Sequence, residues 1–520
     1  MLLLLLAGTG LAFGACSKND SGKDDDGDDP KGPQGYMTIR FDGGFITRNS
    51  AMEEDPGIPQ EAGVTDIRVV LYGVDTRKAE YSWDLSATNG DGSQNFAGGD
   101  VATTLDADPA PADPTNNRFF MVPKKVVKKD YLMVVLANLD HEVNMATQKG
   151  KMLTDFEKVM TYPVNLGDLI GSNTTANQEM ERCFMSNARG YIQVAAADIK
   201  PTPKDALEVG VPKEAPLDRV VAKVWVKPDA PLFVNGSGDF STFTWRLDGT
   251  NKKTYWMRNV TTTSEGGMEV WGDPRAILYA KDPNFDGFSN HRMIEDGMPG
   301  PYPALANEFN RIDKNAVTNV VSATSWEYAL ENTMAAEEQW EDVTTRVILK
   351  GNYIPDGFSA NESYYFFQGK AYKHTDIELM MFNNLWTGHE ALEAAVIADA
   401  NAGPAKKFNF VASNSGSIAG SEPVESVTSG EGITFYKGGI SYYYVLLRHF
   451  NDSQKPNAME YGRYGVVRNN VYQVAIRNIA GPGKPDIPEP EGPDDKEEGY
   501  ISADISIQPW YIREQNVEDL

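Results

Sequence analysis

The chain has 520 residues, of which 41% are hydrophobic and 23% charged, a composition typical of a globular protein with two or three domains. Its 47 glycines, 30 prolines and 23 tyrosines favour β-strands joined by many turns. The formal net charge of −26 argues against a nucleic-acid partner, because an acidic surface repels the phosphate backbone.

The N-terminal residues have the order expected of an exported lipoprotein. Leu2–Leu6 form a hydrophobic stretch that predicts a secretory signal and is too short to span a bilayer. Phe13–Ser17 resembles a bacterial lipobox, so Cys16 is predicted to be lipidated and residues 1–16 to be a lipoprotein signal peptide. The alternative is that Cys16 is an incidental cysteine of the signal. Residues 17–34 are predicted to be a disordered acidic tether.

A strand is predicted directly after this tether. Met37, Ile39 and Phe41 alternate with polar residues, which is the period of a half-buried β-strand. A polar loop, 49–63, follows it, and Arg48 stands at the junction. Proteases act on such exposed loops, although Arg48 is equally well interpreted as an ordinary surface arginine.

The pattern of the remaining sequence predicts strands with a few short helices. Val64–Tyr72 and Tyr131–Asn138 are clear strands, and the second lacks polar alternation, so we expect it to be buried on both faces. Lys227–Pro231 interrupts the pattern and predicts a boundary between an N-terminal domain, 35–228, and a C-terminal domain, 229–480. Further strands are predicted at 181–187, 217–226, 240–247, 344–353, 437–447 and 467–477, and helices at 155–162 and within 376–401.

The last part of the chain combines a tether with a strand. Residues 481–499 are rich in proline and acidic residues, so we expect an extended, solvated linker that reaches roughly 60 Å at about 3 Å per residue. In the segment 500–520, four aliphatic residues alternate with polar ones and predict a half-buried strand: Ile501, Ala503, Ile505 and Ile507.

A strand with an apolar face at the end of a long tether needs a groove, and this groove can belong to another molecule. The first strand has the same pattern as the last, so the two can compete for one groove. Our interpretation is that the first strand is a placeholder, which is cut away so that a neighbour's last strand enters.

The sequence contains no catalytic motif. The five histidines form no H-E-x-x-H pair, and nucleophile elbow, P-loop and dinucleotide fingerprint are all missing. We therefore predict a protein that is not an enzyme, with no catalytic residue, no metal and no cofactor. Asp282–Gly287 offers oxygen ligands for calcium, but an Asx-rich turn is the favoured interpretation. Tyr364–Phe367 is either a carbohydrate platform or, as we favour, core. Cys183 is expected to be buried.

Several stretches together resemble the Bacteroidales fimbrillins, which build type V pili. The most specific are Gly465–Tyr472, with the pattern V-V-R-N-N-x-Y, and Ile505–Trp510, with the pattern Q-P-W. Tyr442–Val445, Leu217–Lys223 and Thr344–Tyr353 are also similar to segments of this family. The resemblance spans the chain from the lipobox onward and is closest to the shaft subunits of the minor fimbriae of Porphyromonas.

This resemblance implies an all-β fold of two tandem transthyretin-like β-sandwich domains. It also implies a lipoprotein precursor at the cell outer membrane, where a maturation protease of arginine specificity cuts between Arg48 and Asn49. The cut removes the first strand, 36–48, with Met37, Ile39 and Phe41. A neighbour's donor strand then fills the gap, and its implied residues are Ile501, Ala503, Ile505, Ile507 and Trp510.

The sequence therefore predicts a structural shaft subunit of a cell-surface fimbrium that supports adhesion and biofilm formation. The implied partners are copies of itself, anchor, tip and accessory subunits, the protease and, before cleavage, the outer membrane through the lipid. The alternative is a non-polymerising surface lipoprotein, or a tip or accessory subunit, that binds glycans or host proteins. An outer-membrane glycan hydrolase is disfavoured, because no motif supports it.

Overall fold

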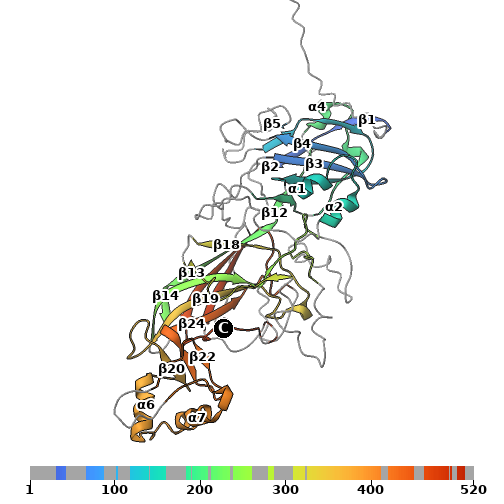
Figure 1. Cartoon of the computed structure of the whole chain (residues 1–520). Helices are drawn as coiled ribbons and strands as arrows, with labels where there is room; N and C mark the ends of the chain where they lie inside the picture. Colours follow the sequence, from blue (N-terminus) through green and yellow to red (C-terminus); the bar gives the residue numbers. More distant parts are fainter. Residues whose placement is uncertain are drawn as a thin grey trace, which may run out of the picture.

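The structure is a computed structural model in which two β-rich bodies follow one another along an elongated molecule, with a small helical unit at the end far from the N-terminal body (Figure 1). It describes residues 31–42, 66–86, 101–103, 118–139, 141–159, 183–188, 190–208, 212–234, 238–259, 279–285, 308–321, 325–410, 420–449, 462–490, 492, 494 and 501–509.

The N-terminal body is a β-sandwich. One layer is a six-stranded sheet in the order β12-β9-β8-β3-β4, with β10 also paired to β8. The other layer consists of the sheet β11-β2-β6-β5 and the pair β1-β7. The strands are β1 (Gln34–Met37), β2 (Ile39–Asp42), β3 (Asp66–Gly73), β4 (Ala79–Ser86), β5 (Val101–Thr103), β6 (Arg118–Met121), β7 (Lys124–Val127), β8 (Tyr131–Ala137), β9 (Met185–Asn187), β10 (Ile192–Val194), β11 (Lys213–Glu214) and β12 (Leu217–Arg219).

The central strands β3 and β8 are buried on both faces, as the unbroken apolar run at 131–138 predicts. The helices α1 (His141–Ala146) and α2 (Leu153–Val159) add Val143 and Phe156 to the same core. Cys183, which is fully buried, belongs to this core as well. Short helical turns complete the body: η2 (Ala196–Asp198) and α4 (Pro203–Ala206).

The C-terminal body is a second sandwich with its own core. Its two sheets have the orders β18-β13-β25-β26 and β17-β14-β19-β24, and the strands β15 and β16 form a separate pair. Val224, Leu349 and Val474 come from both sheets and pack in one core. The strands are β13 (Val221–Val234), β14 (Gly238–Asp248), β15 (Thr250–Asn251), β16 (Phe309–Asn310), β17 (Asn319–Val320), β18 (Trp326–Leu330), β19 (Arg346–Pro355), β24 (Ile440–Leu446), β25 (Asn470–Ile479) and β26 (Ile501–Pro509).

A small unit is inserted between β19 and β24 and lies at the far end of the molecule (Figure 1). Its sheet has the order β21-β20-β23-β22, and its core contains Tyr365, Ile377 and Leu392. Both Tyr364 and Tyr365 are fully buried, so this part of the aromatic run is core and not a carbohydrate platform. The elements of this unit are β20 (Tyr364–Phe367), β21 (Lys370–Tyr372), α6 (His374–Asn383), α7 (Glu390–Asn401), β22 (Val427–Thr428) and β23 (Thr434–Tyr436), with the turns η6 (Gly403–Ala405) and η7 (Lys437–Gly439). The turn η5 (Ala336–Glu338) lies before β19, outside this unit.

The all-β fold of β-sandwiches with few short helices is therefore confirmed. The two cores meet at the start of β13, where Val221 packs in the N-terminal core and Ala222 in the C-terminal core. The strand continues through residues 228 and 229, where the sequence places the boundary. Pro228 is tolerated because the ladder between β13 and β18 ends at Trp225, and a bulge follows it. Across the described part of the chain, no helix has the length and apolar character needed to cross a membrane.

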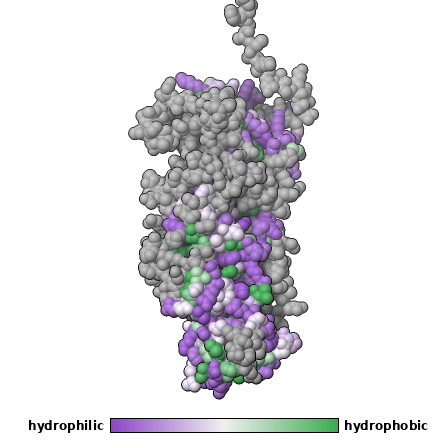
Figure 2. Space-filling model, turned by 60° about the vertical axis from the view of Figure 1, so that its left-hand side comes forward, coloured by the Kyte–Doolittle hydropathy of each residue, from purple (hydrophilic) through white to green (hydrophobic). Residues whose placement is uncertain are grey.

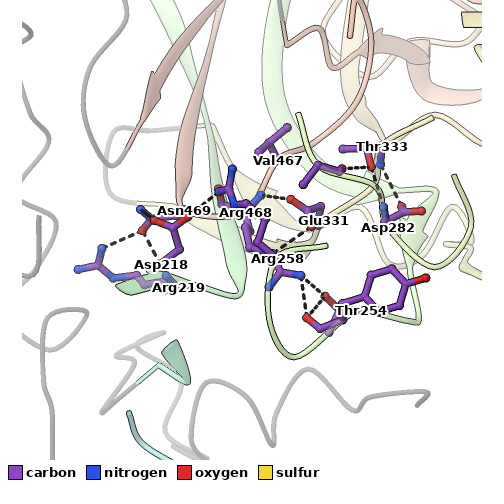
Figure 3. A network of polar contacts seen from close by, with 12 residues as sticks. Asp218, Arg219, Thr254, Arg258, Asp282, Glu331, Thr333, Val467, Arg468 and Asn469 are labelled. Atoms are coloured by element: carbon purple, nitrogen blue, oxygen red, sulfur yellow. Dashed lines mark hydrogen bonds and ion pairs between the residues drawn. The ribbon is translucent and has the colours of Figure 1, made fainter. Parts of the chain in front are cut away.

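A buried polar network joins the two sandwiches (Figure 3). Arg468 and Glu331 are fully buried and form an ion pair with an Nε–Oε2 distance of 3.0 Å. Arg468 also donates to Thr254 Oγ1 at 2.9 Å. From the next residue, Asn469, the side-chain amide donates to Asp218 of β12 at 2.9 Å. Because these groups are desolvated, each charge needs its partner to remain stable.

Arg468→Met leaves the Glu331 carboxylate buried without its cation. We expect this variant to lower the free energy of unfolding by about 3–5 kcal/mol. The double variant Arg468→Met/Glu331→Met removes both charges and should recover most of that loss. Urea titration of both variants measures the difference, and equal losses in both contradict the ion pair as the cause.

Glu327 of β18 gives the C-terminal sandwich a pH dependence. Burial raises the pKa of Glu327 to about 6 from its ordinary value of 4.5, against the opposing effect of Arg246. The folded state thus binds this proton more tightly than the unfolded state, so stability falls as pH rises from about 4.5 through 6. The shift corresponds to about 2 kcal/mol.

Glu327→Gln cannot titrate, and its amide oxygen can still accept from Leu247 N–H, which lies 3.0 Å from Glu327 Oε2. Between pH 4.5 and 7 the variant should therefore gain about 2 kcal/mol relative to the wild type. Urea titrations at both pH values measure this gain. A pH-independent difference between the two proteins contradicts it.

Candidate functional site

The candidate site consists of the first strand segment, the last strand and the chain that leads to the last strand. The first strand segment has neighbours at both edges in the N-terminal sandwich. β1 pairs antiparallel with β7, with Tyr36 opposite Lys125. At its other edge, Tyr36 N–H donates to Lys200 O at 2.7 Å, and Lys200 N–H donates to Tyr36 O at 2.8 Å. The chain therefore lies inside the sandwich and not on its rim.

β2 continues this segment and is enclosed as well. It pairs antiparallel with β6, with Phe41 opposite Phe119, and parallel with β11, with Ile39 opposite Lys213. The Thr38 hydroxyl, between β1 and β2, donates to Met121 O. A strand in this position separates β6 from β11. Its removal would leave a groove between them, with the backbone groups of both strands unpaired on that side.

Two of the three predicted strand residues lie in the core. Met37 is 2% exposed and Ile39 fully buried, and both pack in the N-terminal core. Burial of these two side chains stabilises the sandwich by about 1.5–3 kcal/mol each. Phe41 lies in β2 opposite Phe119, but its side chain lies outside the described residues. Arg40, by contrast, forms an ion pair with Glu214 at the surface.

The last strand, β26, is an edge strand of its own C-terminal sandwich. It pairs antiparallel with β25, from Ile501 opposite Ile479 to Pro509 opposite Asn470. The other edge of β25 is occupied by β13. The register places Ile505 opposite Val474, a buried core residue. Opposed residues of an antiparallel pair share one face, so the alternating aliphatic positions of β26 fall on the core side.

The described part of the chain between β25 and β26 contacts the C-terminal sandwich. We call residues 481–494 the strap. Gly481, Pro482 and Gly483 are buried, and Asp494 is 3% exposed. The expectation of a solvated linker is therefore not met at these buried residues, whereas Lys484, Asp486 and Glu489 are exposed. Tyrosine hydroxyls and backbone groups of the sandwich hold it, and a local composition pattern does not report such partners.

The carboxylate of Asp282, a candidate calcium ligand, makes three hydrogen bonds within the protein. Its carboxylate accepts hydrogen bonds from Asn284 N–H at 2.7 Å, Thr333 N–H at 2.9 Å and Asn251 Nδ2 at 2.8 Å. The bond to Asn284 forms an Asx turn, as the favoured interpretation has it. Burial raises the pKa of Asp282 well above its ordinary value. In the described ranges, no group of three or more His, Cys, Asp or Glu side chains is placed to hold a metal ion.

Four predicted site residues lie outside the described residues: Cys16, Arg48, Asn49 and Trp510. Conversely, the structure reveals partners of the first strand that sequence reasoning missed. Lys200 and the two-residue strand β11 contact β1 and β2 from more than 150 positions away in the chain. Neither has an alternating pattern long enough to predict a strand.

The C-terminal part of the chain matches a known family. A model described as "Major fimbrial subunit protein type IV, Fimbrillin, C-terminal" matches residues 434–516, which include β24, β25, the strap and β26. The predicted resemblance to the Bacteroidales fimbrillins is confirmed by this match, and it supports a fimbrial subunit at the cell surface. The closer similarity to the minor-fimbriae shaft subunit stays a prediction. No curated protein matches the sequence.

Two solved structures show how distant the whole-chain similarity is. The fimbrilin (fimA) from Porphyromonas gingivalis W83 aligns with a TM-score of 0.40 at 15% identity, over 92% of this chain and 99% of that chain. The tip fimbrial protein Mfa3 from Porphyromonas gingivalis, truncated at its C-terminus, aligns with a TM-score of 0.36 at 11% identity, over 92% and 100%. Both TM-scores are below 0.5, so these two similarities support no conclusion about this chain.

Ile39→Ala tests the core role of the first strand. Because Ile39 is fully buried, we expect the uncleaved protein to lose about 2–5 kcal/mol of unfolding free energy. Arg40→Ala, on the same strand, removes a surface ion pair and should cost at most about 1 kcal/mol. Urea titration of the two variants compares them. Equal effects contradict a special role for the buried face.

Proposed function

We propose that the chain is a structural shaft subunit of a cell-surface fimbrium, polymerised by protease-primed donor-strand exchange. The observation that carries this proposal is the enclosure of the first strand segment. Met37 and Ile39 lie in the core, and partner strands flank the segment on both edges. A cut after Arg48 then frees a segment whose departure leaves a strand-shaped place in the sandwich.

The last strand has the pattern that such a place requires. Strand addition contributes main-chain hydrogen bonds, and alternate side chains enter the pockets. Its four aliphatic residues contribute roughly 5–10 kcal/mol in total, before the cost of ordering the strand. Because β26 is an edge strand, its departure leaves the ladder between β25 and β13 intact.

Donation from one copy to the next is head-to-tail and does not close, so it produces a filament. In this proposal the precursor is exported to the outer membrane through lipidation of Cys16, and a protease of arginine specificity cuts between Arg48 and Asn49. The partners are further copies and the anchor, tip and accessory subunits. The fimbrium then supports adhesion and biofilm formation.

A second candidate function is a tip or accessory subunit, or a non-polymerising lipoprotein, that binds glycans or host proteins. The favouring observation lies on the terminal unit, where Leu379, Phe382, Leu385 and Ile397 are 43–59% exposed. Figure 2 shows hydrophobic residues among hydrophilic ones at this end of the molecule. Exposed apolar side chains in one area are typical of contact surfaces.

Cleavage of the purified Cys16→Ser precursor with an arginine-specific protease tests the proposal. We expect a ladder of oligomers on unheated gels after cleavage at Arg48. Arg48→Lys keeps the charge but resists the protease, and deletion of 501–520 removes the donor, so neither should form a ladder. Cleavage at Arg48 without higher species contradicts the shaft function. A tip or accessory binder keeps its ligand after deletion of 501–520.

A further inference from the structure

The strap covers an edge of the second C-terminal sheet. β24 is the last strand of the order β17-β14-β19-β24, and Lys484 pairs with Tyr442 at its edge. Tyr442 N–H donates to Lys484 O at 2.9 Å, and Lys484 N–H donates to Tyr442 O at 2.8 Å. The strap thus occupies an edge that otherwise offers unpaired backbone groups to other chains.

Two buried tyrosines bind the same part of the strap. The Tyr436 hydroxyl donates to Gly483 O at 2.6 Å, and the Tyr443 hydroxyl donates to Gly481 O at 2.7 Å. Burial raises the pKa of Tyr443, which keeps its hydroxyl protonated and able to donate. Release of the strap breaks both of these hydrogen bonds, each of which adds to its binding.

Gly483 fits its place too closely for any side chain. A Cβ atom there lies 2.2 Å from Tyr442 O and 2.8 Å from the ring of Tyr443. Only glycine permits this approach of two backbones. The strap is therefore seated in one register, determined by shape as well as by hydrogen bonds.

The far end of the strap is fastened separately. Glu341 N–H donates to Gly492 O at 3.1 Å, and Asp494 N–H donates to Gln339 O at 3.2 Å. The Thr344 hydroxyl donates to the Asp494 carboxylate. With Asp494 only 3% exposed, this bond is shielded from water, and a charge-assisted hydrogen bond is among the stronger kinds.

We propose that the strap stays bound to its own sandwich during assembly, so that the exchanged segment begins after Asp494. This inference rests on the proposed function. The strap and β26 differ in the contacts that they can form again on another subunit. β26 makes a backbone ladder along one edge, which another sheet edge restores. The strap uses the fit of Gly483, two tyrosine hydroxyls and Thr344, and backbone pairing with a sheet edge does not by itself supply these contacts.

A bound strap limits the distance over which β26 can reach a neighbouring subunit. Only six residues, 495–500, separate the strap from Ile501. At about 3.3–3.6 Å per residue they span roughly 20 Å, compared with roughly 60 Å for a free linker. The groove left by the neighbour's first strand then lies close to Asp494, and successive subunits are held at a short, defined spacing.

A pair of engineered disulfides tests which part moves. Tyr442→Cys/Lys484→Cys joins the strap to β24, because mutually hydrogen-bonded antiparallel residues have Cα atoms about 5.5 Å apart, within disulfide range. Ala475→Cys/Asp504→Cys is the matched lock between β25 and β26. Both are made in the Cys16→Ser precursor, in which the remaining Cys183 is buried. Loss of two free thiols verifies each lock.

We call Tyr442→Cys/Lys484→Cys the strap lock and Ala475→Cys/Asp504→Cys the strand lock. After arginine-specific cleavage, the oxidised strap lock should form the same ladder of oligomers on a gel as its reduced form, at a rate within about twofold. A ladder that is lost on oxidation and restored by reductant overturns the inference. The strand lock reports on the proposed function itself: oxidation should abolish its ladder and reductant restore it. A ladder from the oxidised strand lock contradicts donor-strand exchange, whatever the strap lock does.

Hydrogen exchange of the wild-type chain provides a measurement without substitutions. The backbone amides of Tyr442 and Lys484 should be protected in the monomer and equally protected in the polymer. Loss of their protection in the polymer overturns the inference, because it means that the strap has left β24.

Discussion

Each strand of a β-sandwich needs backbone partners at its edges and an apolar neighbour on its inner face. The strands at the two ends of this chain meet these needs in opposite ways. The first segment is enclosed, with β7 and Lys200 beside β1 and with β6 and β11 beside β2. Among the described strands, the last strand, β26, pairs with β25 alone. An enclosed strand cannot leave without opening the sandwich, whereas an edge strand can.

In the proposed assembly, this asymmetry gives the two sandwiches different roles. The N-terminal sandwich receives a neighbour's strand in place of its own first strand, and the C-terminal sandwich donates its last strand. Between them, the buried network around Arg468 and Glu331 ties β12 of one sandwich to the residues just before β25 of the other (Figure 3). If the strap stays bound as we propose, it limits the donated segment to the residues after Asp494.

Local patterns predicted much of the fold. The alternation at Met37 and Ile39 places both residues in the core, and the apolar run at 131–138 is a doubly buried strand. The domain boundary predicted at Lys227–Pro231 falls within β13, because proline is tolerated beyond the end of the β18 ladder. The binding of the strap could not be predicted from its proline-rich composition, because it depends on tyrosines distant in the chain. Arg48 and the lipidation at Cys16 stay predictions.

The most direct measurement uses a synthetic peptide of residues 495–520 and the Cys16→Ser protein that lacks 501–520. The peptide should bind one-to-one after cleavage at Arg48 and raise the melting temperature of the cleaved protein, but it should leave the uncleaved protein unchanged. A peptide with Ile505→Asp should bind far more weakly, because a buried carboxylate replaces an aliphatic contact. Failure of the unaltered peptide to bind the cleaved protein contradicts the donor role of the last strand.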